Sequence, residues 1–341
     1  MAPETSGGFK VIDPQDAVIC WLLASDEPWT RYRTRLDLLG EPEDAPEVQA
    51  ERAAMLAHPQ VQALIAGASR WGEAAIKRHN DAASPIYLLT TLVEFGLRAA
   101  DPGLGLVAEK LLAHPSPDGA FQSVVNIAPA FGGSGLDTWS WMACDAPTLL
   151  YVLLELGVGD DERLQRAASH LASLVEDNGC RCRAAPDLGK FRGPGAKADP
   201  CPMATLLALK ALACFPDQLN GLPALRAAEM LLQHFSSPPG TKYYLFGAGS
   251  DFRKLKYPFV WYDILHAAYI LSRIPAVIPD PRFRAMLETI LSQADSAGRY
   301  TPSSMYQARK GWSFADKKSP SPWLTFLVLR LQKNASWKEP T

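Results

Sequence analysis

The chain contains two kinds of apolar segment, and both have the spacing of helices. Segments of the first kind are apolar on all sides, mostly begin at a proline, and recur about every sixty residues. Proline is tolerated in the first helical turn because its missing N–H would have no partner there. Helices that are apolar on all sides are buried. The pattern therefore predicts five buried helices: Pro85–Gly96, Pro147–Gly157, Pro202–Ala213, Trp261–Ser272 and Pro322–Leu331.

Segments of the second kind are amphipathic, and one follows each of the first four buried segments. In three of the four repeats a glycine turn comes next, such as Asp118-Gly119-Ala120-Phe121. One apolar face predicts helices that cover the buried set from outside. These outer helices are expected at Leu104–Ala113, Glu162–Val175, Pro223–His234 and Pro281–Gln293.

A unit repeated at a fixed period predicts one architecture that closes on itself. We therefore expect an all-α fold, an α/α toroid with an inner and an outer ring of helices. The N-terminal region is helical but less regular, over Ala17–Leu23, Trp29–Leu39 and Glu47–Ile65. Residues 1–80 are predicted to form a helical cap and first hairpin, and residues 81–341 the toroid repeats, as one closed domain. No window shows the alternation of a β-protein.

Composition narrows the class of protein. Of 341 residues, 48% are hydrophobic, which is enough for a packed core and excludes a disordered chain. The 34 basic and 36 acidic residues give a net charge of −2, which argues against general nucleic-acid or membrane-surface binding. No apolar run reaches the ~18 residues of a membrane span, and the first residues lack the features of a signal peptide. We expect a cytoplasmic protein whose six cysteines are thiols or metal ligands.

Two segments offer metal ligands. Asp199-Pro200-Cys201 opens the third buried helix, and His266 lies in the fourth, 65 residues after Cys201. Since that interval is one repeat, both positions fall near the starts of neighbouring inner helices, at one rim of the ring. Carboxylate, thiolate and imidazole are zinc ligands, and three of them leave the open position of a catalytic site. Cys180 and Cys182 precede Cys201 and could add a fourth ligand, as in a structural site. The alternative is a packed thiol and a histidine satisfied within its helix.

These segments also carry a family resemblance. The helix pair followed by a glycine-aromatic turn resembles the repeat shared by protein prenyltransferase β subunits and triterpene cyclases. The run from Asp263 to Ser272 resembles the Asp-x-x-His-x-x-Tyr-x-Leu-Ser stretch of the β subunits, and Asp199-Pro200-Cys201 resembles their Asp-x-Cys pair. The resemblance implies zinc as the cofactor. Asp263 would then be the residue that orients the groups on the metal side.

The sequence departs from that family at three places. Pro202 stands where the β subunits have a tyrosine, and Trp141-Met142-Ala143-Cys144-Asp145 stands where they have a His-Gly-Gly-Tyr-like segment. The Asp-x-Asp-Asp motif of the cyclases is absent. The first two departures concern the binding of a prenyl diphosphate in the family, so the sequence leaves open whether this chain uses such a substrate. The sequence also names no partner subunit.

The loops that lead into the inner helices are basic. Arg192 and Lys197 precede the third inner helix, and Arg253 and Lys256 precede the fourth. Free N–H groups and the helix dipole favour anions at such helix starts. We therefore predict an anionic or amphipathic small substrate, bearing phosphate or carboxylate beside an apolar part. The alternative is a set of solvated charges that pair with neighbouring acids.

The leading hypothesis is a zinc-dependent, prenyltransferase-like enzyme of bacterial type that acts on such a substrate at the rim. A metal-dependent hydrolase or lyase on the same scaffold is one alternative, and a non-catalytic binding or scaffold protein is another. The predicted metal ligands are Asp199, Cys201, His266 and Cys182. The predicted catalytic residues are Asp263, Arg192, Lys197, Arg253 and Lys256.

Overall fold

The structure is a computed structural model, and it describes residues 16–76, 78–189, 199–238, 241 and 247–336. Regular structure in this part of the chain is mostly helical, which confirms the predicted helical character. The α-helices are α1 (Ala17–Leu23), α2 (Pro28–Arg33), α3 (Pro46–Ala57), α4 (Pro59–Ala68), α5 (Pro85–Phe95), α6 (Leu104–Leu112), α7 (Ala146–Leu156), α8 (Glu162–Ser173), α9 (Pro202–Leu212), α10 (Leu222–Ser236), α11 (Ile264–Leu271), α12 (Pro281–Leu291) and α13 (Pro322–Ser336). A π-helical segment, η1 (Thr34–Leu39), continues α2.

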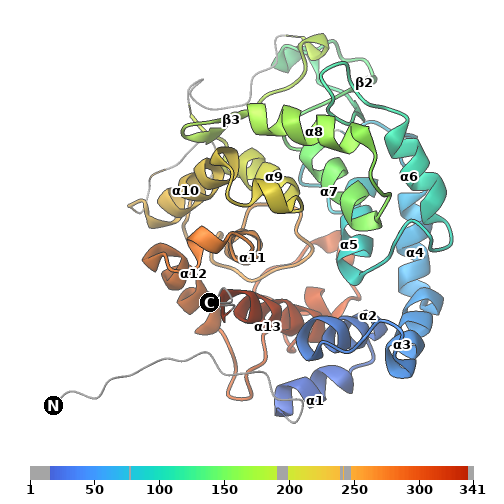
Figure 1. The fold of residues 1–341 in the computed structure, drawn as a ribbon, viewed down its shortest axis with the longest axis vertical. Coiled ribbons are helices and arrows are strands. Elements are labelled where there is room, and N and C mark those ends of the chain that lie inside the picture. The colour runs from blue at the N-terminus through green and yellow to red at the C-terminus, as the bar shows by residue number, and fades with distance from the viewer. Residues whose placement is uncertain (1–15, 77, 190–198, 239–240, 242–246, 337–341) are drawn as a thin grey trace.

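The helices form two concentric layers around a common centre (Figure 1). Contacts run from α5 to α7, α9, α11 and α13 in turn, then from α13 to α2 and from α2 back to α5, so the inner cycle closes. The helices α4, α6, α8, α10 and α12 lie outside this cycle, each packed on an inner helix. The repeat seen in the sequence is thus a repeat of inner and outer helices.

Burial separates the two layers. Every residue of α9 is buried, and in α5 every residue from Ile86 onward is buried. In α8, by contrast, the buried residues are Leu164, Ala167, Ala168 and Leu171, which share one face of the helix. The apolar and amphipathic segments therefore occupy the inner and outer positions that their patterns indicate.

The inner helices share one direction, so their amino ends gather at one rim and their carboxyl ends at the other. Proline stands in the first turn of α2, α5, α7, α9 and α13. Gly96 and Gly157 end α5 and α7 at φ values of 102° and 72°, a conformation that a glycine adopts without strain. Asp263 begins α11 by accepting a hydrogen bond of 2.9 Å from the backbone N–H of His266.

Three details differ from the sequence prediction. The predicted run Glu47–Ile65 is two helices, because His58 is extended and Pro59 begins a new one. The fourth inner helix begins at Ile264 and not at Trp261. Two short hairpins also lie between outer and inner helices, and their strands are too brief to alternate visibly in a sequence. They are β1 (Ser123–Val125) with β2 (Thr138–Ser140), and β3 (Val175–Glu176) with β4 (Gly179–Cys180), both antiparallel.

The segment that leads into α11 fills the centre of the ring. Tyr257 is fully buried, and its ring meets Phe314 and Trp323 edge to face at 4.8 and 5.7 Å. Phe259 follows and stacks on His266 at 4.6 Å. The centre of the ring is therefore packed with aromatic side chains in place of an open channel. No helix in the described part of the chain has the length and apolar character to cross a membrane.

Candidate metal centre and polar interior

Three side chains of metal-ligand type meet at the amino ends of the inner helices. They are His79, in the segment before α5, and Cys144 and Asp145, just before α7. One ligand atom from each lies within 4.8 Å of the others, and no other such trio occurs among the residues that the structure describes. Nitrogen, sulfur and oxygen donors in one trio are a set that zinc accepts.

The contacts within this trio are specific. His79 Nδ1 and Asp145 Oδ1 lie 2.9 Å apart. The second carboxylate oxygen of Asp145 is buried and has no hydrogen-bond partner in the described part of the chain. Tyr87 OH donates to the backbone carbonyl of His79 and so holds the segment before α5 against the helix. A buried carboxylate oxygen without a donor is costly, and a cation would satisfy it.

Electrostatics tie the trio to two further thiols. Burial lowers the pKa of His79, but the charge of Asp145 and its hydrogen bond outweigh burial and raise that pKa above its usual value. Burial, Asp145 and the thiols of Cys182 and Cys201 raise the pKa of Cys144 well above its usual value. A thiol in such surroundings ionises only when a cation is near. Cys182 and Cys201 therefore lie within electrostatic range of Cys144, although neither belongs to the trio.

The predicted ligands Asp199, Cys201 and His266 do not converge to the same extent. Cys201 is buried at the start of α9, and its Sγ accepts from Ala204 N–H at 3.4 Å. Burial raises its pKa to about 12. Asp199 is partly exposed. As metal ligands, Asp199, Cys201, His266 and Cys182 stay a prediction.

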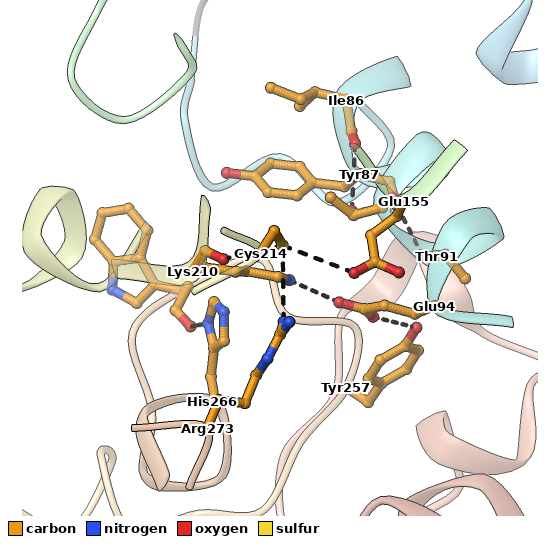
Figure 2. Close-up of polar contacts among 12 residues, drawn as sticks. Ile86, Tyr87, Thr91, Glu94, Glu155, Lys210, Cys214, Tyr257, His266 and Arg273 are labelled. Atoms are coloured by element: carbon orange, nitrogen blue, oxygen red, sulfur yellow. Dashed lines mark hydrogen bonds and ion pairs between the residues drawn. The ribbon is translucent and has the colours of Figure 1, made fainter. Parts of the chain in front are cut away.

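His266 lies in the interior of the ring (Figure 2). Its Nδ1 is 3.4 Å from the carbonyl oxygen of Trp261, and its buried Nε2 has no partner in the described part of the chain. Burial, together with the positive charge of Lys210, lowers its pKa well below the usual value, so the ring is neutral. Neutral imidazole is the form that binds metals or accepts a proton.

The predicted catalytic residues fall in two groups. Arg192 and Lys197 lie outside the described residues. Arg253 and Lys256 both line a cavity of about 1170 Å³ between α10 and the start of α11. Lys256 also acts on the buried Asp263, whose pKa burial raises to about 7 while Lys256 opposes the rise. The structure therefore places Lys256 near the predicted carboxylate of Asp263 and places Arg253 and Lys256 on one cavity, but the roles of these residues stay a prediction.

The interior holds a polar cluster that the sequence prediction missed (Figure 2). Lys210 Nζ on α9 lies 2.7 Å from Glu94 Oε1 on α5, with side chains only 2% and 6% exposed. Tyr257 OH donates to the other oxygen of Glu94 at 2.7 Å. Lys210 Nζ also lies 4.2 Å from the ring centroid of Tyr151. The sequence feature that could have indicated this cluster is one charged residue in each of two otherwise mainly apolar helices, Glu94 in α5 and Lys210 in α9.

The metal trio was missed for a related reason. Cys144 and Asp145 open the second inner helix much as Asp199 and Cys201 open the third, but the sequence prediction read them only as a departure from the family pattern. The sequence prediction did not select His79. Its nearness to Asp145, 66 residues away, depends on how the repeats pack.

Comparisons with known proteins show only low sequence and structural similarity. No protein-family profile matches the sequence, and no curated protein matches it. A crystal structure of a protein from Actinoplanes is 15% identical, with 91% of this chain and 90% of that chain covered at a TM-score of 0.41. The type II terpene cyclase MstE from Scytonema is 11% identical, with 86% and 83% covered at a TM-score of 0.43. Scores this low carry no argument about activity, so any functional conclusion rests on the residues described above.

Proposed function

We propose that this chain is a zinc-dependent enzyme built on an α/α toroid of the prenyltransferase-like kind. In this proposal His79, Cys144 and Asp145 hold the metal at the rim where the inner helices begin. The single observation that carries it is the convergence of the three ligand atoms within 4.8 Å, with a buried carboxylate oxygen of Asp145 left without a donor. Three protein ligands leave one position for water or substrate.

The donor set and its surroundings fit zinc. The side chain of His79 is 28% exposed while that of Asp145 is 3% exposed, so the trio has one side toward solvent and one side in the protein. A bound zinc ion would supply Lewis-acid chemistry and lower the pKa of a coordinated water or thiol. The contact between His79 Nδ1 and Asp145 Oδ1 holds the imidazole ring beside the carboxylate, and Tyr87 fixes the backbone at His79.

The substrate that suits this rim is a small anion with an apolar part. Arg253 and Lys256 line the 1170 Å³ cavity together with Phe252 and Trp261, so cations and aromatic faces stand side by side. The cavity is large enough to admit a small molecule. A phosphate or carboxylate would pair with the two cations, and the aromatic rings would take the apolar part.

The test is the metal content of the purified protein and of matched variants. We expect about one zinc per chain in the wild type, and loss of that zinc in His79→Ala and Cys144→Ser. Cys201→Ala and His266→Ala distinguish this site from the ligand set predicted from sequence. If these two variants lose zinc while His79→Ala and Cys144→Ser retain it, the metal is bound by Asp199, Cys201 and His266. Metal-free protein in every case would favour a non-catalytic scaffold.

Substrate class is tested separately by calorimetry with geranylgeranyl diphosphate. Binding that weakens in Arg253→Gln and Lys256→Gln supports the anion contacts. If the zinc-containing protein does not bind this compound, prenyl diphosphates are excluded as substrates. A hydrolase or lyase that acts on another anion would then be favoured.

A further inference from the structure

The opposite end of the ring contains a second polar cavity, of about 400 Å³. It lies where α5, α7, α11 and α13 end, so the length of the inner helices separates it from the rim that carries the metal trio. Its lining includes four basic side chains and two acidic ones. The basic residues are Arg33, Arg273, Arg330 and Lys333, and the acidic ones are Glu94 and Glu155.

The two carboxylates are already engaged. Glu94 is paired with Lys210 at 2.7 Å and accepts from Tyr257. Glu155 has Arg98 as a partner at 3.9 Å. Neither forms an ion pair with a basic residue of the lining within the described part of the chain. Glu155 also acts electrostatically on Arg273 and Arg330, so the acids of the lining cancel only part of its positive charge.

Asp37, beside the cavity, balances only part of that charge. Its Oδ2 lies 2.8 Å from Arg33 Nη2 and 3.3 Å from Arg330 Nη1, so one carboxylate serves two guanidinium groups. The Nε of Arg33 is buried and has no hydrogen-bond partner among the described residues. A buried N–H group without an acceptor costs free energy.

Two of the four basic side chains of the lining, Arg273 and Lys333, donate hydrogen bonds to backbone carbonyls at helix ends. Cations are favourable at helix carboxyl ends, and Arg273 donates to the carbonyl of Ala213 at 3.1 Å, at the end of α9. Lys333 donates to the carbonyls of Asp37 and Leu38. Helix capping accounts for these two, but it leaves Arg33 and Arg330 sharing one acid.

The side chains are held in place, as a binding site requires. The guanidinium of Arg330 lies 5.5 Å from the ring centroid of Tyr269. Arg273 contacts Cys214 at 3.8 Å, and Figure 2 shows it reaching toward the cluster of Glu155 and Glu94. Arg33 runs past the end of α5, where a Cβ on Gly96 would come within 3.2 Å of its Nη1. Arginine groups held in this way recognise planar or tetrahedral anions well.

We infer that this cavity binds a small dianion, such as a phosphate monoester or a dicarboxylate, at a site distinct from the metal trio. Arg33 and Arg330 are its principal contacts, and Arg273 and Lys333 contribute charge. A dianion would neutralise the positive charge that Asp37 and Glu155 leave uncompensated. The volume of about 400 Å³ lies within the range of small-molecule sites.

The experiment titrates the full chain with inorganic phosphate and, separately, with succinate, by calorimetry at low ionic strength. We expect saturable binding of at least one probe. Arg33→Gln and Arg330→Gln should each weaken it about tenfold or more, since each removes charge-assisted hydrogen bonds. Lys333→Ala, at an exposed position, should weaken it several-fold without disturbing the fold.

Two controls make the outcome decisive. Arg70→Gln removes a surface arginine whose side chain is 72% exposed, and should leave the affinity unchanged. His79→Ala should also leave it unchanged, which separates this site from the metal trio. Absence of binding to the wild type, or equal weakening in Arg70→Gln and Lys333→Ala, would overturn the inference.

Discussion

Lys210 on α9 and Glu94 on α5 form a buried ion pair of 2.7 Å, although α7 lies between their helices in the inner cycle. The pair therefore spans the interior of the ring and does not join adjacent helices. Taking both charges out of water costs several kcal/mol per ion, and the attraction between them offsets this cost only while both are present.

The losses from removing each partner should thus not be additive. We expect Lys210→Met and Glu94→Gln each to lower the free energy of unfolding by about 3–5 kcal/mol, because each leaves an uncompensated buried group. The double variant should lose clearly less than the sum of the two single losses. Denaturant unfolding of the four proteins measures this coupling, and additive losses would show that the pair has no special role.

The ring of helices was largely predictable, and the interior chemistry was not. Runs such as Ile86–Phe95, where most side chains are apolar, indicated the buried helices, and the period of the repeats predicted their order around the ring. Glu94 sits within that same run, yet its partner is 116 residues away. No local pattern connects two such positions, because only the closure of the ring brings α5 and α9 within reach of one ion pair.

The trio of His79, Cys144 and Asp145 shows the same limit at the rim. The sequence prediction placed metal ligands at the starts of the inner helices and chose Cys201 and His266 from a family pattern. Cys144 and Asp145 stand at the equivalent place in the preceding repeat, and their histidine comes from the segment before α5. Repeats make several helix starts equivalent in sequence, so the choice between them depends on side-chain directions that only a structure supplies.

The two helix-ending glycines provide a matched pair for a second prediction. Gly96 and Gly157 both have positive φ, so alanine costs about 1–2 kcal/mol at either position. At Gly96 the added Cβ would also lie 2.8 Å from Cε1 of Tyr32, whereas at Gly157 the nearest atom is Cδ of Arg98 at 4.0 Å. We therefore expect Gly96→Ala to be more destabilising than Gly157→Ala by about 1 kcal/mol or more. Equal losses in thermal or denaturant unfolding would contradict this account of the contact.

Asp263 gives a prediction about pH. Burial raises its pKa in the folded protein to about 7, against 3.8 in an unfolded chain. The folded state then holds more protons than the unfolded state between these two values, so ionisation of Asp263 lowers stability as pH rises through this window. Asp263→Asn keeps an oxygen that can accept from His266 N–H and removes the titration.

The measurement is the unfolding free energy of both proteins at several pH values between 5 and 8. The stability of the wild type relative to Asp263→Asn should fall by on the order of 1 kcal/mol or more from the lowest to the highest pH. Asp295→Asn is the control, because that carboxyl is exposed and hydrogen bonds from the Arg299 and Ala297 backbone lower its pKa, which leaves it ionised throughout this range. If the unfolding free energy of the wild type relative to Asp263→Asn stays constant or grows with pH, Asp263 is not held in its protonated form.

Zinc should stabilise the fold through the trio alone. A ligand that binds only the folded state adds about 2.7 kcal/mol when its concentration is one hundred times its dissociation constant, so chelator-treated wild-type protein should melt several degrees higher after zinc is restored. His79 and Cys144 come from segments on either side of α5 and meet at the start of α7, so a metal between them would join two repeats of the ring. His79→Ala and Cys144→Ser should therefore melt at the same temperature with and without zinc, while Cys201→Ala keeps the shift. If zinc still raises the melting temperature of both His79→Ala and Cys144→Ser, the metal binds elsewhere. If Cys201→Ala also loses the zinc-dependent rise, Cys201 at the start of the third inner helix is a further ligand.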